Sequence, residues 1–339
     1  MEDLVKRWTT QQGKEQLENI IYCLETGQPL ASVTGIKQFV GRWDLRGAKL
    51  STLANKRTIG AGKHELTQRF GTLRLKQVSI ESIDFSFADI SYSYWDRCNI
   101  NNCIFEETKA VELRIIASNF SNCIFRKTNF FYSYFNLNIG SNSGSIISSE
   151  FVESNLSKCI FNFPLIEQCL FNDCNLKETD FDGSRFRDCK FKGVLDSLWF
   201  RGYSLNAQNS VLGLFNKVGP IDYLNPMDNV DFSEAKLIGV SFTNKIDLSK
   251  SIFPNNDNYL LVKNLEKVYT RMKEIINQEW LGEDKRKALA FINNIYYTPN
   301  RQNQSFDLVD KFIVTDEGKD NEFGKKFFNL LKNISLDYM

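Results

Sequence analysis

Large apolar residues recur at every fifth position through the middle of the chain. From Leu75 to Phe135, twelve of the thirteen positions in this register are large and apolar, and the exception is Ala110. The register slips by one across residues 136–145 and then runs without exception from Ile146 to Phe191. A period of five fits neither an α-helix nor an ordinary strand. The pattern therefore predicts a structural repeat with one interior position per five-residue unit.

A smaller residue precedes most of these large residues by two positions. The exceptions include Leu73, Val78, Ile83 and Leu113. This small position holds seven of the eight cysteines, namely Cys98, Cys103, Cys123, Cys159, Cys169, Cys174 and Cys189. No CxxC spacing occurs, which argues against zinc-knuckle and thioredoxin-like sites. We interpret these cysteines as packing residues.

A large apolar residue at i, a small one at i−2 and polar residues elsewhere resemble the pentapeptide-repeat family. SNLSKCIF, CNLKETDF and VDFSEAKL are close to its A(D/N)LXX pattern, and the resemblance covers residues 73–195 with outlying pieces at 43–52 and 230–253. It implies an all-β solenoid, a right-handed quadrilateral β-helix in which four units make one coil and residues 20 apart stack. In that fold Cys103 would stack on Cys123 and Cys169 on Cys189, and we expect reduced, buried thiols.

Helical periodicity replaces the repeat at both ends. Residues 1–40 are expected to form an N-terminal helical cap, whose helix ends at Gly27. The β-helix spans 41–256, with interruptions at 53–72, 136–145 and 196–229. Residues 257–339 form a C-terminal α-helical region of three helices. These helices either cap the last coil, which we expect, or join two chains in a homodimer.

The 20-residue stacking sorts the outward-facing positions into columns. Two neighbouring columns are rich in Tyr and Arg, the residues that anchor many interfaces. The candidate interaction face consists of Arg74, Tyr92, Tyr94, Arg114, Phe131, Tyr132 and Tyr134. The alternative is a surface ladder satisfied by its own cation–π contacts. The apolar interruption adds a candidate interaction loop at Trp199, Phe200 and Tyr203.

Charge and composition argue against several classes of function. The 42 Lys and Arg residues nearly balance the 41 Asp and Glu residues, so no overall basic charge supports direct nucleic-acid binding. The segment TIGAGKHEL only faintly echoes a phosphate loop, and its His64 is the one histidine. We find no catalytic constellation, cofactor motif or metal-ligand cluster. No apolar run approaches the roughly 20 residues of a membrane span.

These observations predict a non-catalytic, cytoplasmic scaffold that binds an unidentified protein partner. The resemblance also supplies an alternative, because one branch of the family protects DNA gyrase by presenting an acidic rod that mimics DNA. Residues 73–200 carry a net charge of only −3. Modulation of a type II topoisomerase therefore stays the second hypothesis, and it requires one predominantly acidic face.

Overall fold

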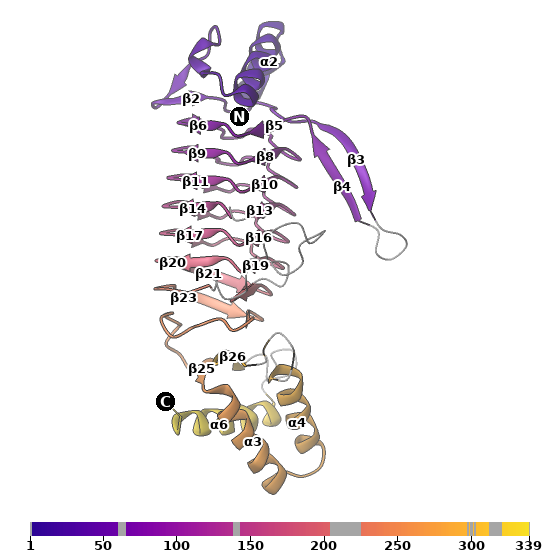
Figure 1. Ribbon diagram of the computed structural model, residues 1–339, viewed down its shortest axis with the longest axis vertical. Helices are drawn as coiled ribbons and strands as arrows, with labels where there is room; N and C mark the ends of the chain where they lie inside the picture. The colour runs from indigo at the N-terminus through magenta and orange to yellow at the C-terminus, as the bar shows by residue number, and fades with distance from the viewer. Residues whose placement is uncertain are drawn as a thin grey trace, which may run out of the picture.

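The chain forms a straight rod of stacked coils with helices at both ends (Figure 1). The computed structural model describes residues 2–59, 66–137, 143–203, 225–296, 298, 301, 303–311 and 321–338. We call the coils between residues 42 and 253 the rod. A two-stranded hairpin, β3 (Leu53–Ile59) and β4 (Leu66–Gly71), projects from its side near the N-terminal end. We call this hairpin the arm.

Three sides of the rod are parallel sheets built from one short strand per coil. The first side contains β5 (Arg74–Lys76), β8 (Tyr94–Asp96), β10 (Arg114–Ile116), β13 (Tyr134–Leu137), β16 (Ile160–Asn162), β19 (Asp180–Asp182), β22 (Trp199–Arg201) and β24 (Ser241–Thr243). The second contains β6 (Ser79–Glu81), β9 (Asn99–Asn101), β11 (Asn119–Ser121), β14 (Ser145–Ile147), β17 (Leu165–Glu167) and β20 (Arg185–Arg187). The third contains β12 (Ile124–Arg126), β15 (Glu150–Val152), β18 (Leu170–Asn172), β21 (Lys190–Asp196) and β23 (Asp231–Ile238).

Shorter pairings complete the rod. Its fourth side is a row of single parallel bridges, such as Asp89↔Lys109 and Lys109↔Asn129. At the N-terminal end, β1 (Gln38–Phe39) pairs with β2 (Arg42–Asp44), and β2 pairs with β7 (Ile83–Asp84). Four sides and a parallel register confirm the expected fold class, a right-handed quadrilateral β-helix with helices at both ends.

The predicted 20-residue register is present, and its slip is an insertion at a corner. Phe120 pairs with Ile100, 20 residues earlier, but with Ile146, 26 residues later. Six extra residues therefore leave the coil between β13 and β14 without disturbing the stack. The chain re-enters at Gly144, whose φ is +68°. A Cβ there would lie 2.4 Å from the carbonyl oxygen of Ser118, so only glycine fits.

The corners of the coils hold residues in the left-handed conformation at every fifth position. Most of these residues are not glycine: φ is +63° at Tyr92, +51° at Glu112 and +61° at Tyr132. This conformation brings Cβ close to the following carbonyl oxygen and is unfavourable for residues other than Gly, Asn and Asp. Backbone hydrogen bonds between coils, such as Glu112 N to Phe131 O at 3.0 Å, hold the strained corners in place.

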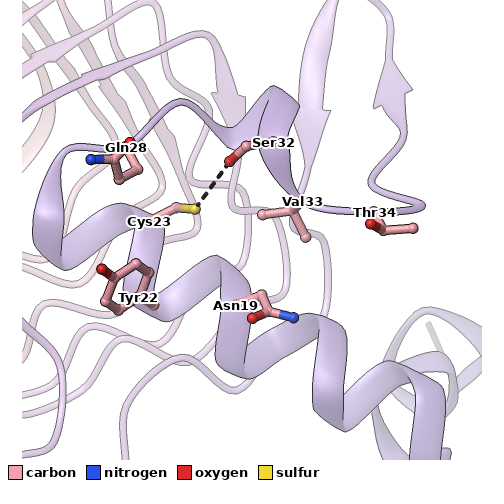
Figure 2. A pocket seen from close by; sticks show the side chains of 7 residues that line it. All are labelled: Asn19, Tyr22, Cys23, Gln28, Ser32, Val33 and Thr34. Atoms are coloured by element: carbon pink, nitrogen blue, oxygen red, sulfur yellow. Dashed lines mark hydrogen bonds between the residues drawn. The ribbon is translucent and has the colours of Figure 1, made fainter.

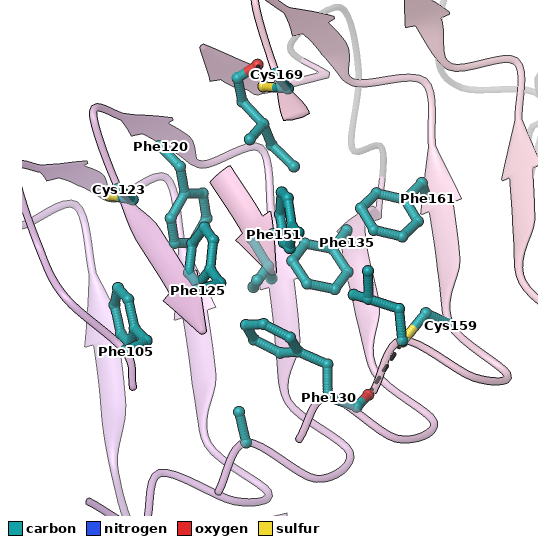
Figure 3. Close-up of a cluster of buried hydrophobic side chains, with 14 of the residues drawn as sticks. Phe105, Phe120, Cys123, Phe125, Phe130, Phe135, Phe151, Cys159, Phe161 and Cys169 are labelled. Atoms are coloured by element: carbon teal, nitrogen blue, oxygen red, sulfur yellow. Dashed lines mark hydrogen bonds between the residues drawn. The ribbon is translucent and has the colours of Figure 1, made fainter. Parts of the chain in front are cut away.

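Stacked phenylalanine rings fill the interior (Figure 3). On the third side, successive ring centroids lie 4.6–5.4 Å apart from coil to coil. This ladder consists of Phe85, Phe105, Phe125, Phe151, Phe171, Phe191, Phe232 and Phe253. The strand spacing of about 4.8 Å sets the ring spacing, so the backbone register and the aromatic packing reinforce each other.

The small interior position supplies a hydrogen-bond donor as well as space. The hydroxyl of Thr108 donates to the carbonyl oxygen of Phe85 over 2.8 Å, and that of Thr179 donates to Leu156 over 2.8 Å. The thiol of Cys159 donates to the carbonyl oxygen of Phe130 over 3.0 Å. Each donor therefore reaches a central residue of the preceding coil, which explains why Ser, Thr and Cys share this position.

The cysteines are free and buried, as predicted. Burial raises the pKa of the Cys123 thiol to about 11 and that of Cys174 to about 12. Both thiols are therefore protonated at neutral pH, which removes the thiolate needed for metal binding or nucleophilic chemistry.

The N-terminal cap matches the expectation. Helix α1 (Glu2–Lys6) and the 3₁₀ turn η1 (Arg7–Thr9) precede α2 (Gln11–Thr26), and η2 (Leu30–Ser32) follows. The α2 helix buries Ile20 and Leu24 against the first coil. Arg7 and Arg46 both donate hydrogen bonds to the carboxylate of Asp44. Burial alone would raise the pKa of this carboxyl, but these hydrogen bonds outweigh burial and hold the pKa well below its ordinary value.

The C-terminal cap differs from the expectation, because a two-stranded antiparallel sheet rather than the helices covers the last coil. Strand β25 (Tyr259–Lys263) pairs with β26 (Phe306–Asp310), so the predicted helix start at 257 is wrong. One face of this sheet contacts the core of the rod through residues such as Leu308. The other, through residues such as Val262, packs into a second core. That core holds α3 (Leu265–Glu279), α4 (Gly282–Tyr296) and α6 (Glu322–Leu336).

The last predicted interruption is too wide at its start. The coil continues through β21 and β22 to residue 203, where the described chain stops, and resumes at 225. Leu195 and Leu198 lie in the interior. The register shortens by one residue here, since Phe200 stacks 19 residues after Phe181.

We expect Phe171→Asp to abolish cooperative folding of the rod. Its ring lies 4.8 Å from that of Phe151 and 4.7 Å from that of Phe191, so the variant buries a charge with no partner, a loss of more than about 4 kcal/mol. The outward-facing neighbour provides the control, Asn172→Asp. Thermal melting by circular dichroism tests this; a Phe171→Asp melting temperature near that of the control would contradict the ladder.

We expect Glu107→Asn to raise the free energy of unfolding by about 0.5–1 kcal/mol, because Asn tolerates the left-handed corner better than Glu does. The φ of Glu107 is +49°. Glu106→Asn is the matched control at a neighbour outside the left-handed region. Urea titration of both variants measures the difference, and equal stabilities would show that the corners are not strained.

Candidate functional site

The base of the arm is fixed to the rod by backbone contacts. Thr72 N donates to Thr52 O over 2.8 Å, so the chain leaves and re-enters the rod at neighbouring points. Gly71 N donates to Tyr92 O over 2.8 Å. A Cβ on Gly71 would lie 2.2 Å from the hydroxyl oxygen of Ser51 and 3.0 Å from the carbonyl oxygen of Ser91, so the close approach of the arm favours glycine here.

A charged cluster beneath the arm orients it further. Arg69 of the arm forms an ion pair with Glu112, which is buried at a corner of the rod. Arg114 donates to the carbonyl oxygen of Arg69. Its guanidinium carbon lies 4.6 Å from the centre of the Phe70 ring. Burial lowers the pKa of Arg114, and the neighbouring Glu112 opposes this effect.

The predicted Tyr and Arg columns are present, but one member is unavailable to a partner. Arg74, Tyr94, Arg114 and Tyr134 align on consecutive strands of the first side. Arg114 is only 8% exposed, and its cation–π contact is with Phe70 of the arm. Arg114 therefore makes its cation–π contact with the arm and not with a stacked Tyr of the same column.

Three aromatic residues of the predicted face gather beside the arm. The ring centroids of Phe131 and Tyr132 lie 6.0 Å apart, and those of Tyr132 and Tyr134 lie 6.2 Å apart in an edge-to-face arrangement. Phe131 is 38% exposed. Burial raises the pKa of Tyr134, and the neighbouring Tyr132 adds to this rise. Tyr134 is therefore a neutral phenol at physiological pH.

A cleft of about 290 Å³ separates these aromatic residues from β4. We call it the arm cleft. It is lined by Thr67, Arg69, Glu112, Phe131, Tyr132 and Lys158. Lys158 Nζ lies 3.6 Å from a carboxylate oxygen of Glu178 in the next coil. The arm cleft thus combines an exposed aromatic wall, a strand edge and charged groups, which suits recognition rather than chemistry.

The predicted interaction loop does not join this site. Phe200 is fully buried in the interior ladder, 5.1 Å from the Phe181 ring, and is therefore a core residue. Trp199 continues the outward column of Tyr134 but lies three coils further along, about 14 Å away. Tyr203 accepts a hydrogen bond from the side chain of Asn244 at its carbonyl oxygen.

Sequence reasoning missed the arm and Lys158. The arm carries a hairpin signal, two short strand-like segments joined by the glycine-containing segment GAG. Residues 60–65, including His64, lie outside the described residues.

A second hollow, of about 520 Å³, lies between α2 and η2 (Figure 2). It is lined by Asn19, Tyr22, Cys23, Gln28, Ser32, Val33 and Thr34. Its Cys23 sulfur lies 3.6 Å from the Ser32 hydroxyl oxygen. The described residues contain no group of His, Cys, Asp and Glu side chains able to hold a metal ion, and no described helix is long and apolar enough to cross a membrane.

The family model for pentapeptide repeats (8 copies) matches residues 165–194. No curated protein matches the sequence. Among solved structures, QnrB1, a plasmid-mediated fluoroquinolone resistance protein, is 13% identical, with 50% of this chain and 84% of that chain covered and a TM-score of 0.24. HetL, involved in heterocyst differentiation regulation in Nostoc sp. strain PCC 7120, is 10% identical, with 54% and 90% covered and a TM-score of 0.20.

With scores this low, neither likeness carries an argument about function. The family match covers residues 165–194, and the parallel register of these residues follows the same five-residue repeat, so the chain contains pentapeptide repeats. Proteins of this family are generally structural or interaction proteins rather than enzymes.

We expect Arg114→Ala to loosen the arm while the rod stays folded, because the variant loses the contact with Phe70 and the hydrogen bond to Arg69. Trypsin should then cleave the arm at Lys56 or Arg57 about tenfold faster, a change equivalent to about 1.4 kcal/mol. Arg126→Ala, an exposed arginine on the third side, is the control. Equal cleavage rates for the two variants would show that Arg114 does not anchor the arm.

Proposed function

We propose that this protein is a non-catalytic scaffold that binds a protein partner through the arm cleft and the aromatic residues beside it. One observation carries the proposal: Phe131, Tyr132 and Tyr134 form a partly exposed cluster next to a rigidly anchored arm. Aromatic residues on a preorganised surface bind with little loss of conformational entropy. Arg74, Tyr92 and Tyr94 form a second part of the proposed surface, on the N-terminal side of Glu112 and Arg114, which the arm occupies.

The alternative, a DNA mimic acting on a type II topoisomerase, receives less support from the charge distribution. It requires one predominantly acidic face. On the third side, however, Lys190 lies 3.0 Å from Asp231 and 2.6 Å from Glu234, and Lys192 lies 3.0 Å from Glu234. Stacked cations thus neutralise carboxylates of the third side, which argues against this side as the acidic face of a mimic.

The proposal places the protein in the cytoplasm, because free, buried thiols suit a reducing compartment. A homodimer through the C-terminal helices stays a separate prediction, which sedimentation would test. The apolar residues of α3 and α6 that it would use, such as Met272 and Phe327, are buried in the second core of the same chain.

We expect Phe131→Asp to weaken partner binding about 30-fold, since loss of an interface anchor costs about 2 kcal/mol or more. The matched control is Val194→Asp, another exposed apolar residue. Affinity capture from the expressing cells, with quantitative mass spectrometry, compares the two variants with the wild type.

One partner retained by the control and lost with Phe131→Asp supports the scaffold. Recovery of gyrase subunits, together with restored supercoiling by gyrase in the presence of a fluoroquinolone, supports the alternative. Identical recovery with Phe131→Asp and the wild type would contradict the proposed surface.

A further inference from the structure

The arm has two strands, and the rod occupies the base of the β4 edge, where Gly71 N donates to Tyr92 O and Arg114 donates to Arg69 O. β3 and β4 form a sheet with no other strand neighbour among the described residues. A two-stranded ribbon is marginally stable alone, and an unpaired strand edge is a template for another strand. Figure 1 shows the arm extending away from the rod beyond its anchored base, with β4 on the side nearer the rod. Beyond these bonded groups the edge of β4 is free, and it borders the arm cleft, which Thr67 and Arg69 line.

The described part of the arm is entirely cationic. Its charged residues are Lys56, Arg57 and Arg69, and neither residues 53–59 nor residues 66–71 include a carboxylate. Arg69 pairs with Glu112. Lys56 and Arg57 are exposed and form no ion pair with the described residues. Lys158 adds a further cation at the arm cleft, where it pairs with Glu178 at 3.6 Å.

The arm cleft has the size and surface for one large side chain. Its volume of about 290 Å³ lies just below the range of small-molecule pockets, and its wall is formed by Phe131 and Tyr132. A strand paired with β4 would lie about 4.8 Å from it and would direct alternate side chains toward the arm cleft.

We infer that the arm captures an extended, acidic segment of a partner protein by β-strand addition to the free edge of β4. One aliphatic or aromatic side chain of the segment packs on Phe131 and Tyr132 in the arm cleft. Its carboxylates lie near Lys56, Arg57 and Lys158, which supply charge complementarity. This inference rests on the proposed function and names the chemistry of the partner.

A displayed library of random peptides, selected on the full chain and counter-selected on Lys56→Glu/Arg57→Glu, tests the inference. Selected peptides should be rich in Asp and Glu around one apolar or aromatic residue. They should bind the charge-reversed variant about tenfold more weakly or worse. Lys236→Glu/Lys263→Glu reverses two exposed lysines near the opposite end of the rod and should bind like the wild type. N-methylation of the peptide backbone should abolish binding, because it removes the ladder hydrogen bonds.

Several outcomes would overturn the inference: no arm-dependent peptides, peptides rich in Lys, Arg or Pro, or peptides insensitive to N-methylation. Tighter arm-dependent binding of a mixed-sequence DNA duplex than of any selected peptide would also overturn it and assign the arm to nucleic acid. If these tests fail while a protein partner is still lost with Phe131→Asp, the scaffold stands and its partner docks as a folded surface.

Discussion

The rod depends on how little room its interior offers. Each five-residue unit sends one large side chain inward, and the residue two positions earlier must share that space. Because Thr108, Thr179 and Cys159 donate to carbonyl oxygens of the preceding coil, the small position also binds successive coils together. Apolar packing and hydrogen bonding therefore require the same register, so a shift by one residue would lose both.

The two ends of this rod expose strands that would otherwise associate. At the N-terminal end, α2 covers the first coil directly with Ile20 and Leu24. At the C-terminal end, the two-stranded sheet of β25 and β26 buries one face on the rod and the other on the helices. The chain thus uses a helix at one end and a two-faced sheet at the other for the same purpose.

The β-helix could be predicted because its period is local: every interior position repeats within five residues, and twenty residues close a coil. The pairing of β25 with β26 could not be predicted, because strands that are buried on both faces lack polar alternation. Leu260, Leu261 and Val262 fit a helical pattern equally well. The arm cleft was out of reach for another reason. Arg69 meets Glu112 across 43 residues of sequence, and only the corner geometry of the coils brings the two together.

The chain leaves the rod to form the arm, and returns to it, at one corner of a coil. Thr52 and Thr72 are neighbours across one corner. The residues between them therefore form an insertion, and the coil continues on the other side of it. Deletion of this insertion would leave the interior phenylalanine ladder unchanged. Recognition and folding are thereby separated in this chain. The arm can be exchanged for a different element at the same corner, and the specificity of the protein can change while the register of the rod is kept.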